Sequence, residues 1–341
     1  MSSVKSSLTL ATDRSPKEKG ALLPSDKEKD VEKSKARGQS SQEPRGAVVL
    51  FAVVLYAVCS SCMLIVNKVA VTYVAAPGFV LFCQLASSAF AVFVFSAFGL
   101  VESDELEWKK VKAFVLVVVA FVGAVFTNMK TLQYSNVETF IVFRSSTPLL
   151  ISLLDWAVLG RQLPSLQSWL SLVGLLLGAV MYVVYDSAFD VRAYAWVAAW
   201  FAVFTFDQVY IKFVCDTVDM TNWGRVYYTN LLSCLPVAVM VFAFGEQDVI
   251  LARDGAHSWS FHAVAALLVS CLAGIAMSYS AFLLRALVSA TSFTVVGIMC
   301  KIATVVINCL IWDKHATPMG LVALSICLAA GSAYKQAPYR S

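Results

Sequence analysis

Ten long apolar segments are the feature of this sequence that most restricts its fold. Each has about 20 residues, the length that an α-helix needs to cross the hydrocarbon core of a bilayer. In the whole chain 59% of residues are hydrophobic and only 14% are charged, whereas soluble domains carry charge on about a quarter of their residues. Because a helix satisfies its own backbone hydrogen bonds in lipid, we predict an all-α polytopic membrane protein with ten transmembrane helices. The predicted spans are residues 47–73, 78–100, 113–132, 137–159, 166–185, 194–214, 225–244, 261–285, 290–312 and 317–334.

The N-terminal segment differs sharply from the rest of the chain. Up to Gly46 it holds ten lysines and arginines and seven acidic residues among serines and prolines. Such a composition cannot bury enough apolar surface to fold, so residues 1–45 are predicted to be a disordered tail. No apolar stretch follows a basic start, and the acidic residues argue against an organellar transit peptide. The first span is therefore expected to act as its own signal anchor.

The basic residues between the spans predict how the chain lies in the membrane. Ten spans place both termini on the same side, and 19 lysines and arginines fall on that side against five on the other. Cytosolic loops carry the excess of basic residues. We therefore predict a multi-pass membrane protein with both termini in the cytosol.

Two parts of the chain resemble each other, which predicts an internal repeat. VETFIVFRSSTPLLISLLDWAVLGRQLP (137–164) runs parallel to TSFTVVGIMCKIATVVINCLIWDKHATP (291–318). Each half would hold five spans, and because five is odd, the second half would insert upside down. Inverted repeats are typical of secondary transporters, whose substrate site lies near the midplane between the repeats. The predicted parts are a cytosolic tail 1–45, a first five-helix repeat 46–186, a second five-helix repeat 187–335 and a short cytosolic C-terminus 336–341.

Two cations, Arg144 and Lys301, lie inside predicted spans. At about 1.5 Å per helical residue, Lys301 lies about 16 Å deep, near the midplane, and Arg144 about 10 Å deep. A lone cation there costs at least about 2.5 kcal/mol. The pair predicts a site for a substrate with two negative charges, such as a diphosphate, which Arg144 would bind bidentately and Lys301 as a point charge. The alternative is that Asp207 or Glu138 neutralises one of the two cations within the protein.

Polar and aromatic side chains in three other spans fit a binding cavity. Each alone has the simpler explanation of an interhelical hydrogen bond, worth about 0.6 kcal/mol. Together they offer aromatic faces and amide edges, which suit a ribose and a base. They are Tyr56, Ser60, Ser61, Asn67, Tyr228, Thr229, Asn230, Ser233, Ser278, Tyr279 and Ser280.

Motifs of soluble enzymes are absent from the sequence. There is no G-x-x-x-x-G-K-[ST], no H-E-x-x-H and no G-x-S-x-G. Cys59 and Cys62 form a C-x-x-C without a second cysteine or histidine pair, so small apolar packing residues explain them better than a metal site. We expect no enzymatic activity, cofactor, metal or nucleic-acid partner. Without an ATPase motif, uphill transport would have to come from exchange or from an ion gradient.

Five segments carry a resemblance to a known family. They are NVETFIVFRSSTPLL, AYAWVAAW, VYIKF, SATSFTV and TVVINCLIWDKHATP. Over residues 47–335 the chain resembles nucleotide-sugar transporters of the drug/metabolite transporter superfamily, and most of all the plant-type Golgi transporters of GDP-fucose and GDP-galactose.

The resemblance also implies site residues. In that family a G-x-x-N-K motif in the ninth span and an aromatic-Tyr-Asn-Asn motif in the seventh help to hold the sugar nucleotide and its guanine. GIMCK keeps Gly297 and Lys301 but has Cys300 in place of asparagine, and YYTN has Thr229 in place of the first asparagine. The phosphate-binding part of the match is thus complete, whereas the base-reading part is not. Other positions implied by the resemblance are Tyr56, Ser60, Asn67, Lys68, Tyr228, Asn230, Ser278, Tyr279 and Phe293.

These observations together predict an antiporter of the Golgi membrane. It would exchange a cytosolic GDP-sugar, with GDP-fucose or GDP-galactose favoured over GDP-mannose, for lumenal GMP by alternating access. The substrate and the nucleoside monophosphate carry similar negative charge, so one pair of cations could serve both. Exchange of another nucleotide-sugar such as a UDP-sugar, exchange of sugar phosphates in a plastid, and a non-transporting scaffold or receptor are the alternatives. The sequence leaves open the sugar, the base and whether the protein is a homodimer.

Overall fold

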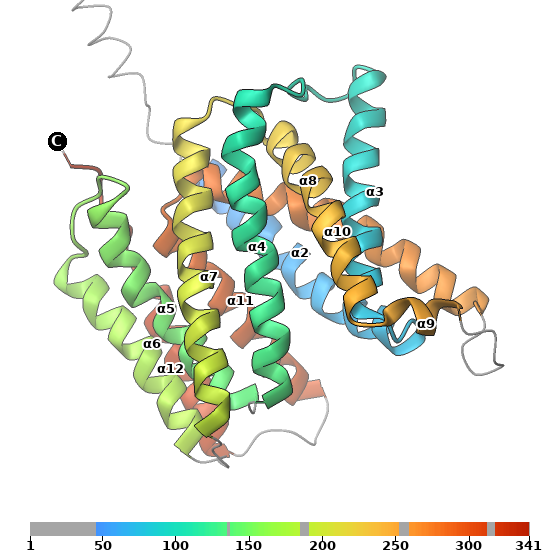
Figure 1. Ribbon diagram of the computed structural model, residues 1–341. Helices are drawn as coiled ribbons and strands as arrows, with labels where there is room; N and C mark the ends of the chain where they lie inside the picture. Colours follow the sequence, from blue (N-terminus) through green and yellow to red (C-terminus); the bar gives the residue numbers. More distant parts are fainter. Residues whose placement is uncertain (1–45, 135–136, 185–190, 252–258, 312–317, 341) are drawn as a thin grey trace, which may run out of the picture. The chain divides into compact units, whose positions relative to one another are not determined.

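The computed structural model describes residues 46–134, 137–184, 191–251, 259–311 and 318–340 (Figure 1). Over these residues the chain is almost entirely helical, with no β-strand. Ten of the described helices coincide with the ten predicted apolar segments. They are α2 (Gly46–Tyr73), α3 (Pro77–Ala97), α4 (Trp108–Tyr134), α5 (Val137–Ala157), α6 (Leu166–Val184), α7 (Val191–Thr217), α8 (Asn222–Ala243), α10 (Phe261–Leu287), α11 (Ala290–Ile311) and α12 (Pro318–Ser332). A further short helix, α9 (Glu246–Leu251), lies in the connection between α8 and α10.

The prediction of helices in the apolar segments is therefore confirmed. Among the described residues, 6 helices are long and apolar enough to cross a membrane, namely α2, α3, α4, α7, α8 and α10. That α5, α6, α11 and α12 also cross the membrane stays a prediction, as does the division into two inverted repeats. The predicted tail, 1–45, lies outside the described residues.

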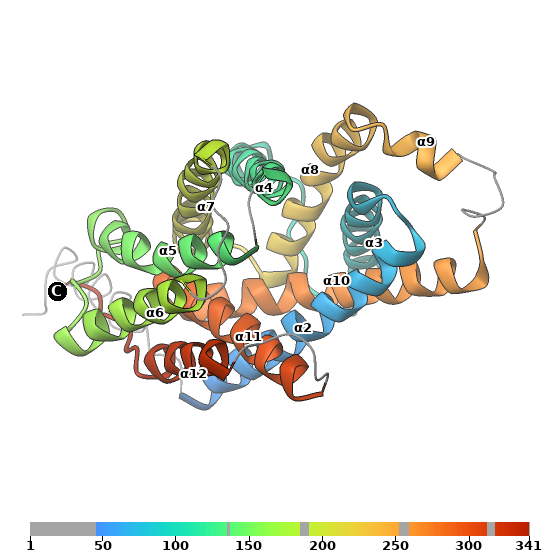
Figure 2. The same cartoon turned by 90° about the horizontal axis from the view of Figure 1, so that it is seen from below.

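Helices from the two predicted halves interleave. The most extensive contacts join α2 with α10, α4 with α7, α3 with α8 and α6 with α12, and α5 also packs on α11 (Figure 2). These pairs have a regular relation. Replacing each helix by the one five predicted spans away turns α2–α10 into α7–α4 and leaves the other three pairs unchanged. The halves therefore build one helical unit instead of two separate bundles.

Small residues allow α6 and α12 to approach each other closely. A Cβ at Gly174 would lie 3.0 Å from the Ala330 Cβ. A Cβ at Gly178 would lie 2.6 Å from the Cys327 Sγ and 3.2 Å from the Ala323 carbonyl oxygen. Glycines four residues apart face one way on a helix, and such a small-residue face is how apolar helices pack in membranes.

The N-terminus of α3 is held by a carboxylate from the other half of the chain. Glu246, in the first turn of α9, accepts hydrogen bonds from the backbone N–H groups of Gly78 at 3.0 Å and Phe79 at 2.8 Å. Such N–H groups have no partner within their own helix, and an acidic side chain is stabilised there. Glycine leaves room for it, because a Cβ at Gly78 would lie 2.9 Å from the Glu246 carboxylate.

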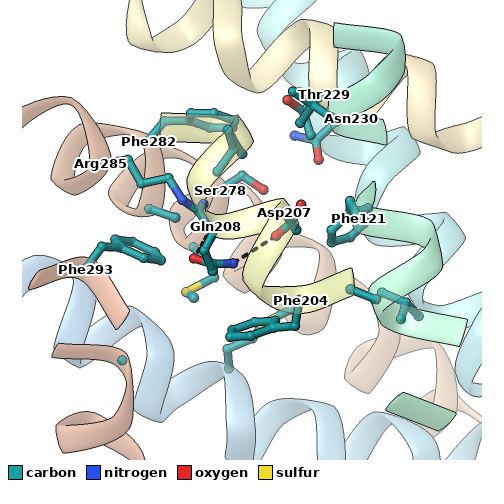
Figure 3. Close-up of a pocket in the computed structure, with 18 of the residues that line it drawn as sticks. Phe121, Phe204, Asp207, Gln208, Thr229, Asn230, Ser278, Phe282, Arg285 and Phe293 are labelled. Carbon is teal, nitrogen blue, oxygen red and sulfur yellow. Dashed lines mark hydrogen bonds between the residues drawn. The ribbon is translucent and has the colours of Figure 1, made fainter. Parts of the chain in front are cut away.

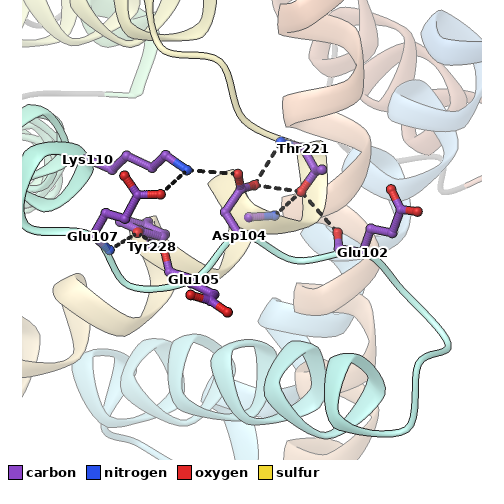
Figure 4. A network of polar contacts seen from close by, with 8 residues as sticks. Glu102, Asp104, Glu105, Glu107, Lys110, Thr221 and Tyr228 are labelled. Carbon is purple, nitrogen blue, oxygen red and sulfur yellow. Dashed lines mark hydrogen bonds and ion pairs between the residues drawn. The ribbon is translucent and has the colours of Figure 1, made fainter.

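The N-terminus of α8 shows the matching arrangement with the halves exchanged (Figure 4). Asp104, after α3, accepts hydrogen bonds from the backbone N–H and the hydroxyl of Thr221, both at 2.9 Å. The Thr221 hydroxyl accepts the Gly224 N–H at 3.0 Å and thereby caps the helix. A Cβ at Gly224 would overlap with Asp104, as one at Gly78 would with Glu246. Each half thus holds one helix N-terminus of the other.

The contact between Asp104 and Thr221 predicts a pH-dependent contribution to stability. Burial alone would raise the pKa of Asp104, but hydrogen bonds from Thr221 and Lys110 outweigh it and hold the pKa below its ordinary value. A carboxylate with a lowered pKa stabilises the folded state above the unfolded-state pKa of about 3.9, and this contribution is lost as the pH falls through the folded-state value. We expect Asp104→Asn to lower the free energy of unfolding by about 0.5 to 1 kcal/mol at neutral pH, with the difference disappearing below about pH 3.

Chemical unfolding in detergent micelles across this pH range measures the difference. Glu102→Gln is the matched control, because the Glu102 side chain is exposed and only its backbone carbonyl joins the network. A deficit of Asp104→Asn that stays constant with pH would contradict the assigned role of the carboxylate.

The last residues of the chain bind to the connection between α5 and α6. The Arg161 guanidinium donates to the Ala337 carbonyl at 2.8 Å, and the Arg340 N–H donates to the Gly160 carbonyl at 2.8 Å. The Gln336 side-chain oxygen accepts the Ser289 N–H at 2.9 Å, next to the start of α11. The C-terminal segment therefore ties the α5–α6 connection to α11.

Candidate functional site

A cavity of about 380 Å³ lies among the helices (Figure 3). Its walls come from α2, α3, α4, α5, α7, α8, α10 and α11. Among the described residues none from α6 or α12 lines it, so these two helices support the wall from outside. Both predicted halves contribute helices, as expected of a substrate site between repeats.

Half of the predicted site residues line this cavity. They belong to five helices, and the fold brings them together although Tyr56 and Gly297 lie 241 residues apart in the sequence. They are Tyr56, Arg144, Thr229, Asn230, Ser278, Phe293 and Gly297.

Lys301, the cation nearest the middle of a predicted span, is not among the residues that line the cavity. It follows Gly297 by about one turn of α11, and its side chain is accessible although protein atoms surround it. Arg144 lines the cavity, and Lys301 lies one turn beyond the lining residue Gly297 on α11.

Three predicted residues support the cavity from behind its wall. Asn67 accepts a hydrogen bond at 2.8 Å from the side-chain N–H of Gln84, which itself lines the cavity. The Tyr279 ring stacks on Trp223 with centroids 4.3 Å apart. Tyr228 is buried, and its hydroxyl accepts the backbone N–H of Glu107 at 2.7 Å, so it anchors the segment before α4 (Figure 4).

Of the last three predicted residues, Cys300 and Ser60 do not line the cavity. Cys300 is buried in an apolar cluster with Tyr56 and Phe293. Ser60 is half-buried on α2 and does not line the cavity. The side chain of Lys68 lies outside the described residues.

Two arginines of the cavity lie against aromatic rings. The Arg144 guanidinium is 5.0 Å from the centroid of Phe204, and that of Arg285 is 4.0 Å from the centroid of Phe293. Tyr56 packs on the same Phe293 ring, with centroids 5.0 Å apart. Stacking on an aromatic face holds a guanidinium in place while its edge stays available for hydrogen bonds.

A glutamine links Arg285 to a buried carboxylate. Arg285 Nη2 donates to Gln208 Oε1 at 3.2 Å, and Gln208 Nε2 donates to Asp207 Oδ2 at 2.8 Å (Figure 3). Asp207 was suggested from the sequence as a partner for Lys301 or Arg144. In the structure it interacts electrostatically with Arg285 instead. The other suggested partner, Glu138, has its side chain outside the described residues.

Several buried polar atoms that line the cavity have no hydrogen-bond partner among the described residues. A buried polar atom left without a partner costs about 1 to 3 kcal/mol. A polar ligand with both acceptors and donors would supply these partners, as no apolar ligand could. The atoms are Asn128 Oδ1, Asp207 Oδ1, Thr229 Oγ1, Asn230 Nδ2 and Arg285 Nε.

The sequence did not single out Arg285, Phe204, Gln84 or Asn128 as site residues. Arg285 counted as a basic residue near the cytosolic end of its span, whereas the structure turns it into the cavity. One signal was available, since α10 continues with apolar residues to Leu287, beyond the arginine. The direction of the side chain depends on helix packing and could not be read from the sequence.

Comparison with known proteins identifies a family that matches this chain. Residues 47–335 match the model of the Triose-phosphate Transporter family. The chain belongs to this family. The family is part of the drug/metabolite transporter superfamily, so the resemblance found in the sequence is confirmed.

Individual members of the family are similar over most of the chain. GDP-fucose transporter 1 of Arabidopsis thaliana is 41% identical, over 83% of this chain and 84% of that protein. GDP-mannose transporter GONST3 of the same plant is 36% identical, over 82% and 76%. UDP-sugar transporter UST74c of Drosophila melanogaster is 24% identical, over 84% and 76%. Membership of this family makes the chain a membrane transporter and not an enzyme.

A solved crystal structure shares the fold. It is 13% identical, with a TM-score of 0.60, over 84% of this chain and 95% of that chain. At this identity the similarity concerns the fold alone.

Proposed function

We propose that this protein exchanges a cytosolic GDP-sugar for GMP from the lumen across the Golgi membrane. The observation that carries the proposal is a cavity with two arginines and several buried polar atoms without partners, in a member of a transporter family. Its similarity to transporters named for GDP-fucose and GDP-mannose supports a GDP-sugar as the substrate. GDP-fucose or GDP-galactose is favoured, as the resemblance of the sequence implies.

The distribution of side chains in the cavity supports a nucleotide as the ligand. Arg144 would bind the diphosphate bidentately, and Lys301 would add a point charge from the turn of α11 beyond Gly297. Thr229 and Asn230 lie in Figure 3 on the far side of Asp207 from Phe293, and their partnerless atoms suit the edge of a base. The aromatic ring of Phe121 in the wall offers a face for the ribose, base or sugar.

Alternating access is the proposed mechanism, with ten spans in two inverted repeats and both termini in the cytosol. The regular relation between the helix pairs supports the repeats, as do the matching carboxylate contacts of α3 and α8. In such transporters one repeat rocks against the other around a fixed site. Exchange follows if the protein switches conformation more slowly without a ligand than with one. Without a ligand, the polar atoms of the cavity would have to move while they lack hydrogen-bond partners.

Counter-transport in proteoliposomes tests this function. Liposomes preloaded with GMP are expected to accumulate radiolabelled GDP-fucose or GDP-galactose at least about tenfold faster than empty ones, because no ATPase motif is present to drive uptake. UDP-galactose and triose phosphate, offered in parallel, represent the two other transporter classes. Equal uptake into loaded and empty liposomes would contradict exchange, and preferential uptake of UDP-galactose or triose phosphate would contradict the substrate.

A further inference from the structure

We propose that Arg285 is a second phosphate-binding residue, which acts with Arg144 from the opposite half of the chain, and that Gln208 and Asp207 hold it in place while the cavity is empty. The proposal rests on the proposed function, since it concerns how the same cavity binds the phosphates of its substrate. The sequence pattern assigned the phosphate contacts to Arg144 and Lys301 and did not include Arg285.

The position of Arg285 fits this role. It lies in the last turn of α10 with its side chain at the cavity wall, and the Phe293 ring covers one face of the guanidinium at 4.0 Å. Nη2 is bound to Gln208, while Nε is buried without a partner among the described residues. A guanidinium fixed by a ring on its face and by one hydrogen bond presents its remaining N–H groups in a defined direction.

Both arginines line the same cavity, to which Tyr56 also contributes. Tyr56 packs on the Phe293 ring that covers the Arg285 guanidinium. An anion in this cavity would be attracted by both arginines. Two arginines can supply two bidentate contacts, which suits the oxygens of a diphosphate better than a single arginine does.

The arrangement around Asp207 differs from that of a purely structural ion pair. A structural pair would place the carboxylate directly on the guanidinium, because a buried charge needs its partner close. Here Gln208 separates the two groups, and Asp207 Oδ1 and Arg285 Nε both lack partners among the described residues. The carboxylate offsets part of the charge of Arg285 without occupying the edge that a phosphate would use.

The hydrogen bond from the Arg285 side chain to Gln208 is not the only polar contact that joins α10 to α7 at this level. Lys212 donates to the backbone carbonyl of Arg285 at 2.8 Å and forms an ion pair with Asp216 at 2.7 Å. Both contacts would remain after the side chain of Arg285 is removed. Arg285→Ala is therefore expected to fold.

Binding of ligands that differ only in phosphate tests the proposal. Purified full-length wild type, Arg285→Ala and Arg285→Lys are compared by calorimetry with guanosine, GMP, GDP and inorganic pyrophosphate. We expect Arg285→Ala to lose affinity for GDP and pyrophosphate by about tenfold or more, the loss of one charge-assisted contact, with guanosine changing by less than about twofold. Arg285→Lys should fall between the two, because it keeps the charge but not the planar fork.

Arg225→Ala is the matched control. Arg225 is a buried arginine on α8 that donates to the Cys215 carbonyl at 2.8 Å and does not line the cavity. Its loss should lower stability while leaving the ratio of GDP to guanosine affinity unchanged. An unchanged ratio in Arg285→Ala, or in Arg285→Lys if the alanine variant does not fold, would overturn the proposal. Wild type that binds pyrophosphate but fails the GDP-sugar exchange assay would count against the proposed substrate and not against the phosphate subsite.

Discussion

Replacing Lys301 with alanine is expected to lower the rate of exchange by about 100-fold while leaving the ligand-free protein as stable as the wild type or slightly more stable. The loss of exchange follows if Lys301 contacts the phosphates, because removing one charged partner in a partly desolvated site costs about 2 to 5 kcal/mol of binding. Stability is retained because the side chain is accessible and its charge is repelled by Arg144. Removing the lysine relieves that repulsion and leaves no packing defect.

Asp207→Asn should behave in the opposite way. Asp207 is buried and is the carboxylate in the electrostatic field of Arg285, so its neutralisation leaves a cation in the cavity without compensation. Breaking a buried charge pair from one side destabilises a protein by about 3 to 5 kcal/mol, and we expect the lower end because Gln208 stays in place. Ligand-free melting temperature and the shift produced by GDP are measured for both variants. A sharp loss of ligand-free stability in Lys301→Ala, with the GDP shift retained, would make this lysine a structural residue.

Gly178→Val is expected to have the largest effect on folding, about 3 kcal/mol or more in the free energy of unfolding. A Cβ at this position would lie 3.2 Å from the Ala323 carbonyl oxygen and 3.3 Å from the Cys327 backbone nitrogen, so backbone atoms of α12 would have to move. Flexible side chains cannot absorb that overlap. Since no described residue of α6 or α12 lines the cavity, whatever folds should bind GDP with nearly wild-type affinity.

Leu177→Val, on the same helix, is the control variant for Gly178→Val. Leu177 is exposed, so its shortening should change stability by less than about 0.5 kcal/mol. Unfolding of both variants in detergent and GDP binding by the folded fraction are the measurements. A Gly178→Val variant with wild-type stability would mean that α6 and α12 are not closely packed.

The two cations predicted from the sequence show how far residue patterns could identify the site. Arg144 and Lys301 stood out because a charge within an apolar span is costly, and the structure places Arg144 in the cavity wall and Lys301 one turn beyond Gly297 on α11. Arg285 did not stand out, because an arginine in the last turn of a helix is usually explained by the interface with water. Gln208 and Asp207 gained significance only from their contact with it.

The sequence by itself determined the helical segments and the family, and half of the site residues that it predicted line the cavity. Apolar length decides which segments become helices in a membrane protein, and this is a local property of the chain. Contacts between distant residues decided the rest. The carboxylates Asp104 and Glu246 meet helix N-termini more than a hundred residues away, and the direction of Arg285 depends on how α10 packs against α7 and α11. Contacts of this kind leave no periodic pattern in the sequence. A helix has the same amino-acid composition whichever way its polar side chains turn in the packed bundle.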